Sequence, residues 1–269
     1  MSAASDSKGS EMSFWDHLDE LRGTLIHSIV YVCAFSALGL IFKSLLFENI
    51  ILAPTEPGFC VYRLLGWDFS MDLINVDLSA QFFVHLKASF AAGFILAFPF
   101  VVWELWKFIA PALYEREKVA MRTAFLMSGG LFYLGVLVGY FFVLPVCLQF
   151  FMNYSVSDAV QNSITLGSYM SMFMSMVLLI GLVFEFPTVV LVLGKLGVVS
   201  RGMLRGGRKY ALVVILVLAA LITPSDPFSM FVLAVPMYLL YEASILICPK
   251  GDGGTAPEEP SGTSSVGTK

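Results

Sequence analysis

The chain has 269 residues, of which 58% are hydrophobic and only 13% are charged, and its formal net charge at pH 7 is −4. A soluble domain usually carries about a quarter charged residues, and the mildly acidic balance argues against binding to nucleic acid. Because the apolar residues are gathered in long runs, the composition predicts an integral membrane protein.

The chain begins with a polar segment that has no basic region followed by a short apolar stretch and a small-residue cleavage site. We therefore expect a flexible tail over residues 1–12 and no signal peptide. Residues 13–24 predict an amphipathic helix that leads into the first apolar run. Its apolar stripe has the spacing i, i+4, i+7 and i+11 and consists of Phe14, Leu18, Leu21 and Leu25.

Two acids, Asp16 and Glu20, lie on the opposite, polar face of this helix. Their i, i+4 spacing places like charges together, which destabilises an isolated helix by about 0.2 to 0.5 kcal/mol. A cationic partner would make the same arrangement favourable. The alternative is a solvated face, or a pair between Glu20 and a basic residue of its own chain.

Six apolar runs are predicted to be membrane-spanning helices. They fall at about 25–47, 82–106, 123–149, 169–193, 210–222 and 228–247. The first four reach the length of roughly 20 residues that a bilayer requires. The fifth has 13 residues, which give a helix of only about 20 Å, so we expect helices five and six to be short. The predicted fold is an all-α integral membrane domain over residues 13–249, followed by a disordered tail over residues 250–269.

The basic residues predict the orientation. With six spans, 13 of the 16 Lys and Arg residues fall in the two terminal segments and in the second and fourth connections. The positive-inside rule then places both termini in the cytoplasm. With only five spans, the same basic residues would be distributed over both sides of the membrane. Four of the spans also contain a proline, which suits bent helices in a concave bundle or reflects ordinary proline usage in membranes: Pro99, Pro145, Pro187 and Pro236.

A second acidic cluster stands in the connection after span two, where Pro111 ends the helix and Glu115 and Glu117 begin the next one. Acids at a helix start complement the helix dipole, and this alone would explain them. It does not explain two acidic clusters on a side of the membrane where the loops are otherwise basic.

Glu185 lies inside the fourth apolar run. An ionised carboxylate facing lipid costs roughly 2.5 to 3.5 kcal/mol on insertion scales. Such a group must therefore be buried among other helices, paired or protonated, or have a functional role. One alternative is a proton-coupled small-solute transporter with Glu185 as the proton carrier, and another is a passive assembly scaffold. We find no internal repeat and no second membrane carboxylate in a matching position, which disfavours the transporter.

No pattern in the chain indicates catalysis. There is no nucleophile–base pair and no phosphate-binding loop, and the four cysteines have neither metal-type spacing nor a disulfide framework. They are Cys33, Cys60, Cys147 and Cys248. We expect no enzymatic activity, no cofactor and no metal.

Four segments resemble the TatC family in order and spacing, from about residue 14 to residue 247. They are HLDELR at 17–22, FIAPALYEREK at 108–118, the pair Glu185 and Pro187, and ITPSDPFSMFVLAVPMYLLYE at 222–242. TatC is the multispanning receptor subunit of the twin-arginine protein translocase. The resemblance implies a glove-like concave fold.

The resemblance also implies roles for individual residues. Glu20 and Glu117 match the acids that contact the paired arginines of a signal peptide, with Asp16 and Glu115 as weaker candidates. Glu185 matches an intramembrane polar site that receives a partner helix. The remaining matches are the outer hairpin at Pro224 and Asp226 and the motif positions Arg22, Pro54, Pro111 and Pro187. Met230 stands where the family often has Gln, so a side-chain hydrogen bond proposed for that position cannot form from the thioether in the same way.

In function, the resemblance implies a receptor that binds twin-arginine signal peptides of folded proteins and nucleates a translocation complex. Its partners would be single-span TatA- and TatB-type subunits, with several copies of the chain in the complex. Transport would be driven by the proton-motive force across a prokaryotic inner membrane.

Overall fold

The computed structural model describes residues 14–67, 70–110, 115–155, 157, 163–223 and 226–248, and for residues 14–17, 115–121 and 123 it describes the backbone alone. The tails expected over residues 1–12 and 250–269 lie outside the described residues, as do Pro111 and Pro224.

Nearly all of the described chain is helical, as the sequence predicted. In chain order the helices are α1 (Phe14–Ile41), α2 (Lys43–Leu46), the π-helix η1 (Phe47–Ile51), the 3-10 helix η2 (Ala53–Thr55), α3 (Cys60–Leu65), α4 (Ala80–Ile109), α5 (Glu115–Val138), the π-helix η4 (Gly139–Val143), α6 (Leu144–Asn153), α7 (Leu166–Val183), α8 (Phe186–Lys195), α9 (Arg201–Gly206), α10 (Arg208–Ile222) and α11 (Pro227–Ile247).

Two short strands add a feature that the sequence did not indicate. β1 (Leu73–Ile74) pairs in parallel with β2 (Ile164–Thr165), with Leu73 opposite Ile164. The pair joins the connection after α3 to the segment that enters α7. Two residues are too few for an alternating pattern to appear in a sequence.

Five helical stretches of the described chain are long and apolar enough to cross a membrane. They are Leu18–Ile41, Ala80–Ile109, Ala124–Asn153, Leu166–Lys195 and Pro227–Ile247. Helix α10 has 15 residues and falls short of a full span, as predicted for the fifth helix. Helix α11 has 21 residues and matches the predicted run 228–247 to within one residue. At 1.5 Å per residue it is about 31 Å long, so it reaches the length of a span although it was expected to be short. A count of six spans stays a prediction.

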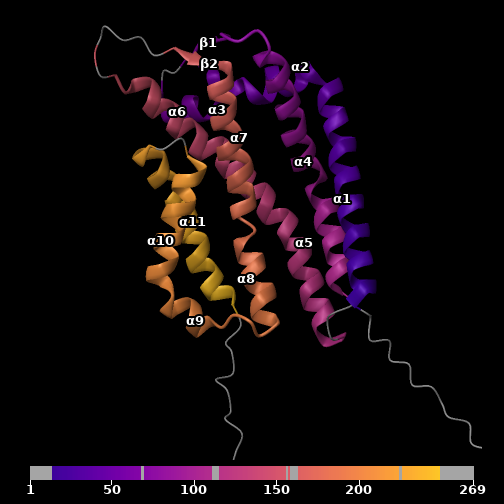
Figure 1. Ribbon diagram of the computed structural model, residues 1–269. Helices are drawn as coiled ribbons and strands as arrows, with labels where there is room; N and C mark the ends of the chain where they lie inside the picture. Colours follow the sequence, from indigo (N-terminus) through magenta and orange to yellow (C-terminus); the bar gives the residue numbers. More distant parts are fainter. Residues whose placement is uncertain are drawn as a thin grey trace, which may run out of the picture.

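The start of α1 and the end of α11 lie at the same end of the bundle, at the bottom of Figure 1. This arrangement is what an even number of crossings requires. The side on which both ends lie, the cytoplasm by the positive-inside rule, stays a prediction.

Helix α1 packs along α4 at the edge of the bundle (Figure 1). Small residues allow the two backbones to approach closely. A Cβ atom added to Gly93 of α4 would lie 2.2 Å from Oγ of Ser36, and one added to Gly39 of α1 would lie 3.0 Å from Cα of Ser89. Helices in lipid associate through such close contacts, because burial of apolar surface gives little gain there.

A second close contact joins α5 to α7. A Cβ atom on Gly135 would lie 2.7 Å from Cβ of Phe184, and one on Gly139 would lie 2.6 Å from the carbonyl oxygen of Met176. Gly139 also begins the π-turn through which α5 continues into α6. Beyond the contact, the fourth span is interrupted between α7 and α8 at Phe184 and Glu185.

The close contact of α1 with α4 gives a test of stability. Gly93→Ala should lower the free energy of unfolding by about 1 to 3 kcal/mol, because the new methyl group meets backbone atoms of α1 that cannot swing aside. Thermal unfolding in detergent micelles measures the effect. Gly130→Ala is the matched control, since a Cβ atom there has nothing within 4 Å. Equal stability of the two variants would contradict this packing.

Candidate functional site

The predicted recognition acids belong to the end of the bundle where α1 begins, α4 ends and α5 begins (Figure 1). Glu20 is partly buried on α1, whereas its neighbours Asp19, Leu21 and Arg22 are exposed. Asp16, Glu115 and Glu117 fall where only the backbone is described, so their side chains lie outside the described residues.

Helix α1 packs on α4 through its more polar face and exposes its apolar stripe, which is the opposite of an amphipathic helix in a soluble protein. The less exposed positions recur every four residues along the side that packs on α4, and they include Glu20, Thr24, Ser28, Val32 and Ser36. The apolar stripe is exposed, with Leu18 at 40%, Leu21 at 43% and Leu25 at 59%. Such a stripe suits lipid. Glu20 therefore lies on the α4 side of α1 rather than on a fully solvated face.

The contacts between the two antiparallel helices place Glu20 along α4. Ser36 lies against Gly93, and the ring of Tyr31 stacks on Phe100 with centroids 5.4 Å apart. One turn further, Nδ1 of His27 lies 3.8 Å from Oε2 of Glu104. Extending this register by two more turns brings Glu20 level with the last residues of α4, where the chain turns toward α5.

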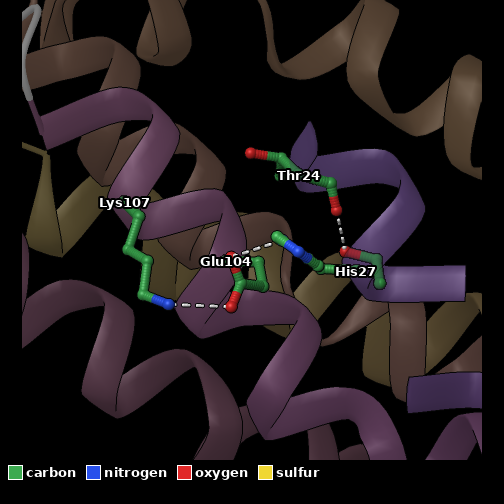
Figure 2. Close-up of polar contacts among 5 residues, drawn as sticks. Thr24, His27, Glu104 and Lys107 are labelled. Carbon is green, nitrogen blue, oxygen red and sulfur yellow. Dashed lines mark hydrogen bonds and ion pairs between the residues drawn. The ribbon is translucent and has the colours of Figure 1, made fainter. Parts of the chain in front are cut away.

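Glu104 is a polar centre that the sequence analysis did not select. It is buried, with its side chain 7% exposed, and its Oε1 accepts a hydrogen bond from Nζ of Lys107 at 2.8 Å. Figure 2 shows Lys107 and His27 reaching the carboxylate from α4 and α1. The sequence does contain an indication of this pair, because an acid inside an apolar run and a lysine three residues later lie on one face of a helix.

The second polar centre is Glu185, which precedes α8 where the fourth span is interrupted. Its Oε2 accepts a hydrogen bond from the hydroxyl of Ser128 on α5 at 2.6 Å. Its Oε1 is enclosed and makes no hydrogen bond of good geometry among the described residues, although Thr188 and the backbone of Phe132 lie close to the carboxyl group. Buried carboxylate oxygens without a donor are costly. The first partner of Glu185 is thus a residue of its own chain.

The close contact between α5 and α7 explains this bond. Ser128 lies seven residues, or two turns, before Gly135 on the same face of α5. Because Gly135 admits the backbone of α7 next to Phe184, the following residue, Glu185, comes within reach of Ser128. Pro187 is buried in the first turn of α8, where its missing N–H group would have no helical partner in any case.

Asp226 caps the last helix. One of its carboxylate oxygens accepts a hydrogen bond from the backbone N–H of Ser229 at 2.6 Å, which satisfies a free donor at the start of α11. This structural role is sufficient to explain an acid at the position. Its other oxygen has no partner among the residues described. Met230 follows on the first turn and is partly buried.

Pro54 is buried in the 3-10 helix η2 at the opposite end of the bundle. Its carbonyl oxygen accepts a hydrogen bond from the hydroxyl of Tyr62 at 2.8 Å. Burial, together with the neighbouring Tyr140, raises the pKa of Tyr62, so the phenol stays protonated and able to donate. Tyr169 of α7 donates likewise to the carbonyl of Ile51. These bonds hold the connection between α1 and α4 on the bundle.

Comparison with known proteins gives consistent matches. Residues 16–236 match the family described as Sec-independent protein translocase protein (TatC). The TatC protein of Blattabacterium sp. from Periplaneta americana is 35% identical over 253 residues, which cover 88% of this chain and 95% of the relative. That of Aquifex aeolicus is 35% identical over 237 residues, or 88% and 94%. A crystal structure of the twin-arginine translocase receptor TatC superposes with a TM-score of 0.73 at 35% identity, covering 86% of this chain and 97% of that one.

The bond between Ser128 and Glu185 predicts a loss of stability on its removal. Ser128→Ala should lower the free energy of unfolding in detergent by about 0.5 to 2 kcal/mol, because the carboxyl group loses its donor. In a Glu185→Leu background the same substitution should have little effect. Ser171→Ala, at an exposed serine of α7, is the control. An undiminished effect in the double variant would show that Ser128 acts independently of Glu185.

Proposed function

We propose, from the premise that this chain belongs to the TatC family and is a membrane component of the twin-arginine protein translocase, that it is the receptor for twin-arginine signal peptides. The observation that carries the proposal is the position of Glu20. This acid lies on the α4 side of α1, level with the end of α4, and the α4–α5 connection leads directly to Glu115 and Glu117.

The chemistry of the ligand fits two acids at this place. Arginine presents a planar fork that pairs with a carboxylate through two parallel hydrogen bonds, which lysine cannot reproduce. Glu20 and Glu117 would each receive one arginine, and Asp16 and Glu115 would add to the field that attracts the peptide. Such a site at the membrane surface would capture the signal before its apolar part enters the bilayer.

Glu185 would serve a different step, the docking of a single-span subunit of the TatA or TatB type. One of its oxygens is held by Ser128 and the other has no donor among the described residues. Because this oxygen is enclosed in the chain alone, a docking helix would displace its neighbours and supply the donor from a polar side chain, in a setting where water is absent. The outer hairpin with Pro224 and Asp226 would provide a further contact for partners.

The setting that we propose is a prokaryotic inner membrane with both termini in the cytoplasm. Several copies of the chain would assemble in one complex, and folded substrates would be exported at the expense of the proton-motive force. In the rival function, a proton-coupled small-solute transporter, Glu185 would carry the proton. Uptake of a solute by proteoliposomes that contain this chain alone would favour the rival.

The proposed arginine site predicts the effect of removing one carboxylate. Glu20→Gln should weaken binding of a twin-arginine peptide about tenfold, the effect of one lost charge-assisted hydrogen bond. Fluorescence anisotropy of a labelled peptide with the chain in nanodiscs measures the affinity. Asp19→Asn is the matched control, because it removes a neighbouring carboxylate that is exposed. Equal affinities for twin-arginine and twin-lysine peptides would refute the proposed function.

The separate role of Glu185 predicts a separation of phenotypes. Glu185→Gln should leave the affinity for the twin-arginine peptide within about twofold of the parent, because the residue is held by Ser128 of α5 rather than by α1 or α4. It should impair co-purification of single-span subunits and export of a folded reporter. Loss of peptide binding in this variant would instead place Glu185 in the recognition site.

A further inference from the structure

We infer that Glu104 is a positioning residue for signal-peptide binding: held between His27 and Lys107, its carboxylate sets the rotation of α1 on α4 and thereby the direction of Glu20. The inference rests on the proposed function of Glu20 as an arginine ligand. Glu104 does not itself contact the peptide.

The burial of Glu104 indicates that its partners are required. Its side chain is 7% exposed, so an unpaired charge there would be expensive. The strong bond to Lys107, at 2.8 Å, stays within α4 and cannot by itself join two helices. The contact with His27, at 3.8 Å, is the one that reaches across to α1, as Figure 2 shows.

His27 and Glu20 lie on one face of α1. They are seven residues apart, and seven steps of 100° bring the second side chain to within about 20° of the first. Any rotation that moves His27 away from Glu104 therefore moves Glu20 by the same angle. A side-chain tip about 6 Å from the helix axis moves about 3 Å when the helix turns by 30°, which is enough to break a hydrogen bond.

Helix α1 needs such a restraint at this end. It packs mainly on α4, and only 6% of its membrane-spanning window is buried. The backbone contacts at Gly39 and Gly93 restrain its far half. Midway along α1, the polar contact of His27 with Glu104 adds a second restraint, about two helical turns from Glu20.

A double-mutant cycle tests the inference, with binding of twin-arginine and twin-lysine peptides to the full chain in nanodiscs as the measurement. Glu104→Gln should weaken binding of the twin-arginine peptide about tenfold, a size typical of residues that act through another. Binding of the twin-lysine peptide should change little, so discrimination between the two falls. In a Glu20→Gln background, Glu104→Gln should cause no further loss, because both act through one carboxylate.

Two further variants protect the test against simple misfolding. His27→Ala leaves the bond between Glu104 and Lys107 intact but removes the contact between helices, and it should show the same loss and the same non-additivity. His27→Lys places an ammonium group opposite Glu104 and should retain binding. The control is Glu242→Gln, which breaks another ion pair at this end, with Arg208 at 2.8 Å, and should leave peptide binding unchanged.

The outcomes separate the two proposals. Failure of the parent chain to bind the twin-arginine peptide in preference to the twin-lysine peptide overturns the proposed function and this inference with it. When the parent binds, parent-like affinity in Glu104→Gln overturns the inference alone. It is also overturned when the losses in Glu104→Gln and Glu20→Gln add, or when Glu242→Gln shows an equal loss.

Discussion

Close backbone contact between helices is the constraint on which the polar sites of this protein depend. Lipid solvates apolar side chains, so helices in a bilayer gain stability from tight packing and from polar pairs. Glycine and serine allow α4 to meet α1 at Gly93 and α7 to meet α5 at Gly135. Each contact brings a carboxylate of one helix within reach of a partner on the next.

The two carboxylates that result differ in their setting. Glu104 is close to the predicted membrane surface and has side-chain nitrogens from two helices beside it, those of Lys107 and His27. Glu185 follows an interrupted helix and has the neutral hydroxyl of Ser128, with one oxygen left without a donor. The first arrangement is complete and suits a structural restraint. The second lacks a hydrogen-bond donor to one carboxylate oxygen, which a further helix could supply.

Much of the architecture followed from the sequence. The apolar runs predicted a helical membrane protein, and the short fifth helix was evident from its length. The motifs identified the TatC family, which the comparisons confirm. The two-residue strands were not predicted, and the sixth helix was expected to be short although its predicted run, 228–247, matches α11 to within one residue. A strand of two residues is too short to show an alternating pattern.

The sequence by itself determined the class of protein, the positions of its helices and which acids carry its motifs, because these depend on local pattern and composition. Only the tertiary structure decided which way each acid faces. The helical period of α1 shows that Glu20 is opposite the leucine stripe, but not that this stripe faces outward while Glu20 faces α4. Nor does a linear pattern pair Glu185 with Ser128, 57 positions apart. Such pairings depend on where glycines let two backbones meet, and that contact exists only after the helices have packed.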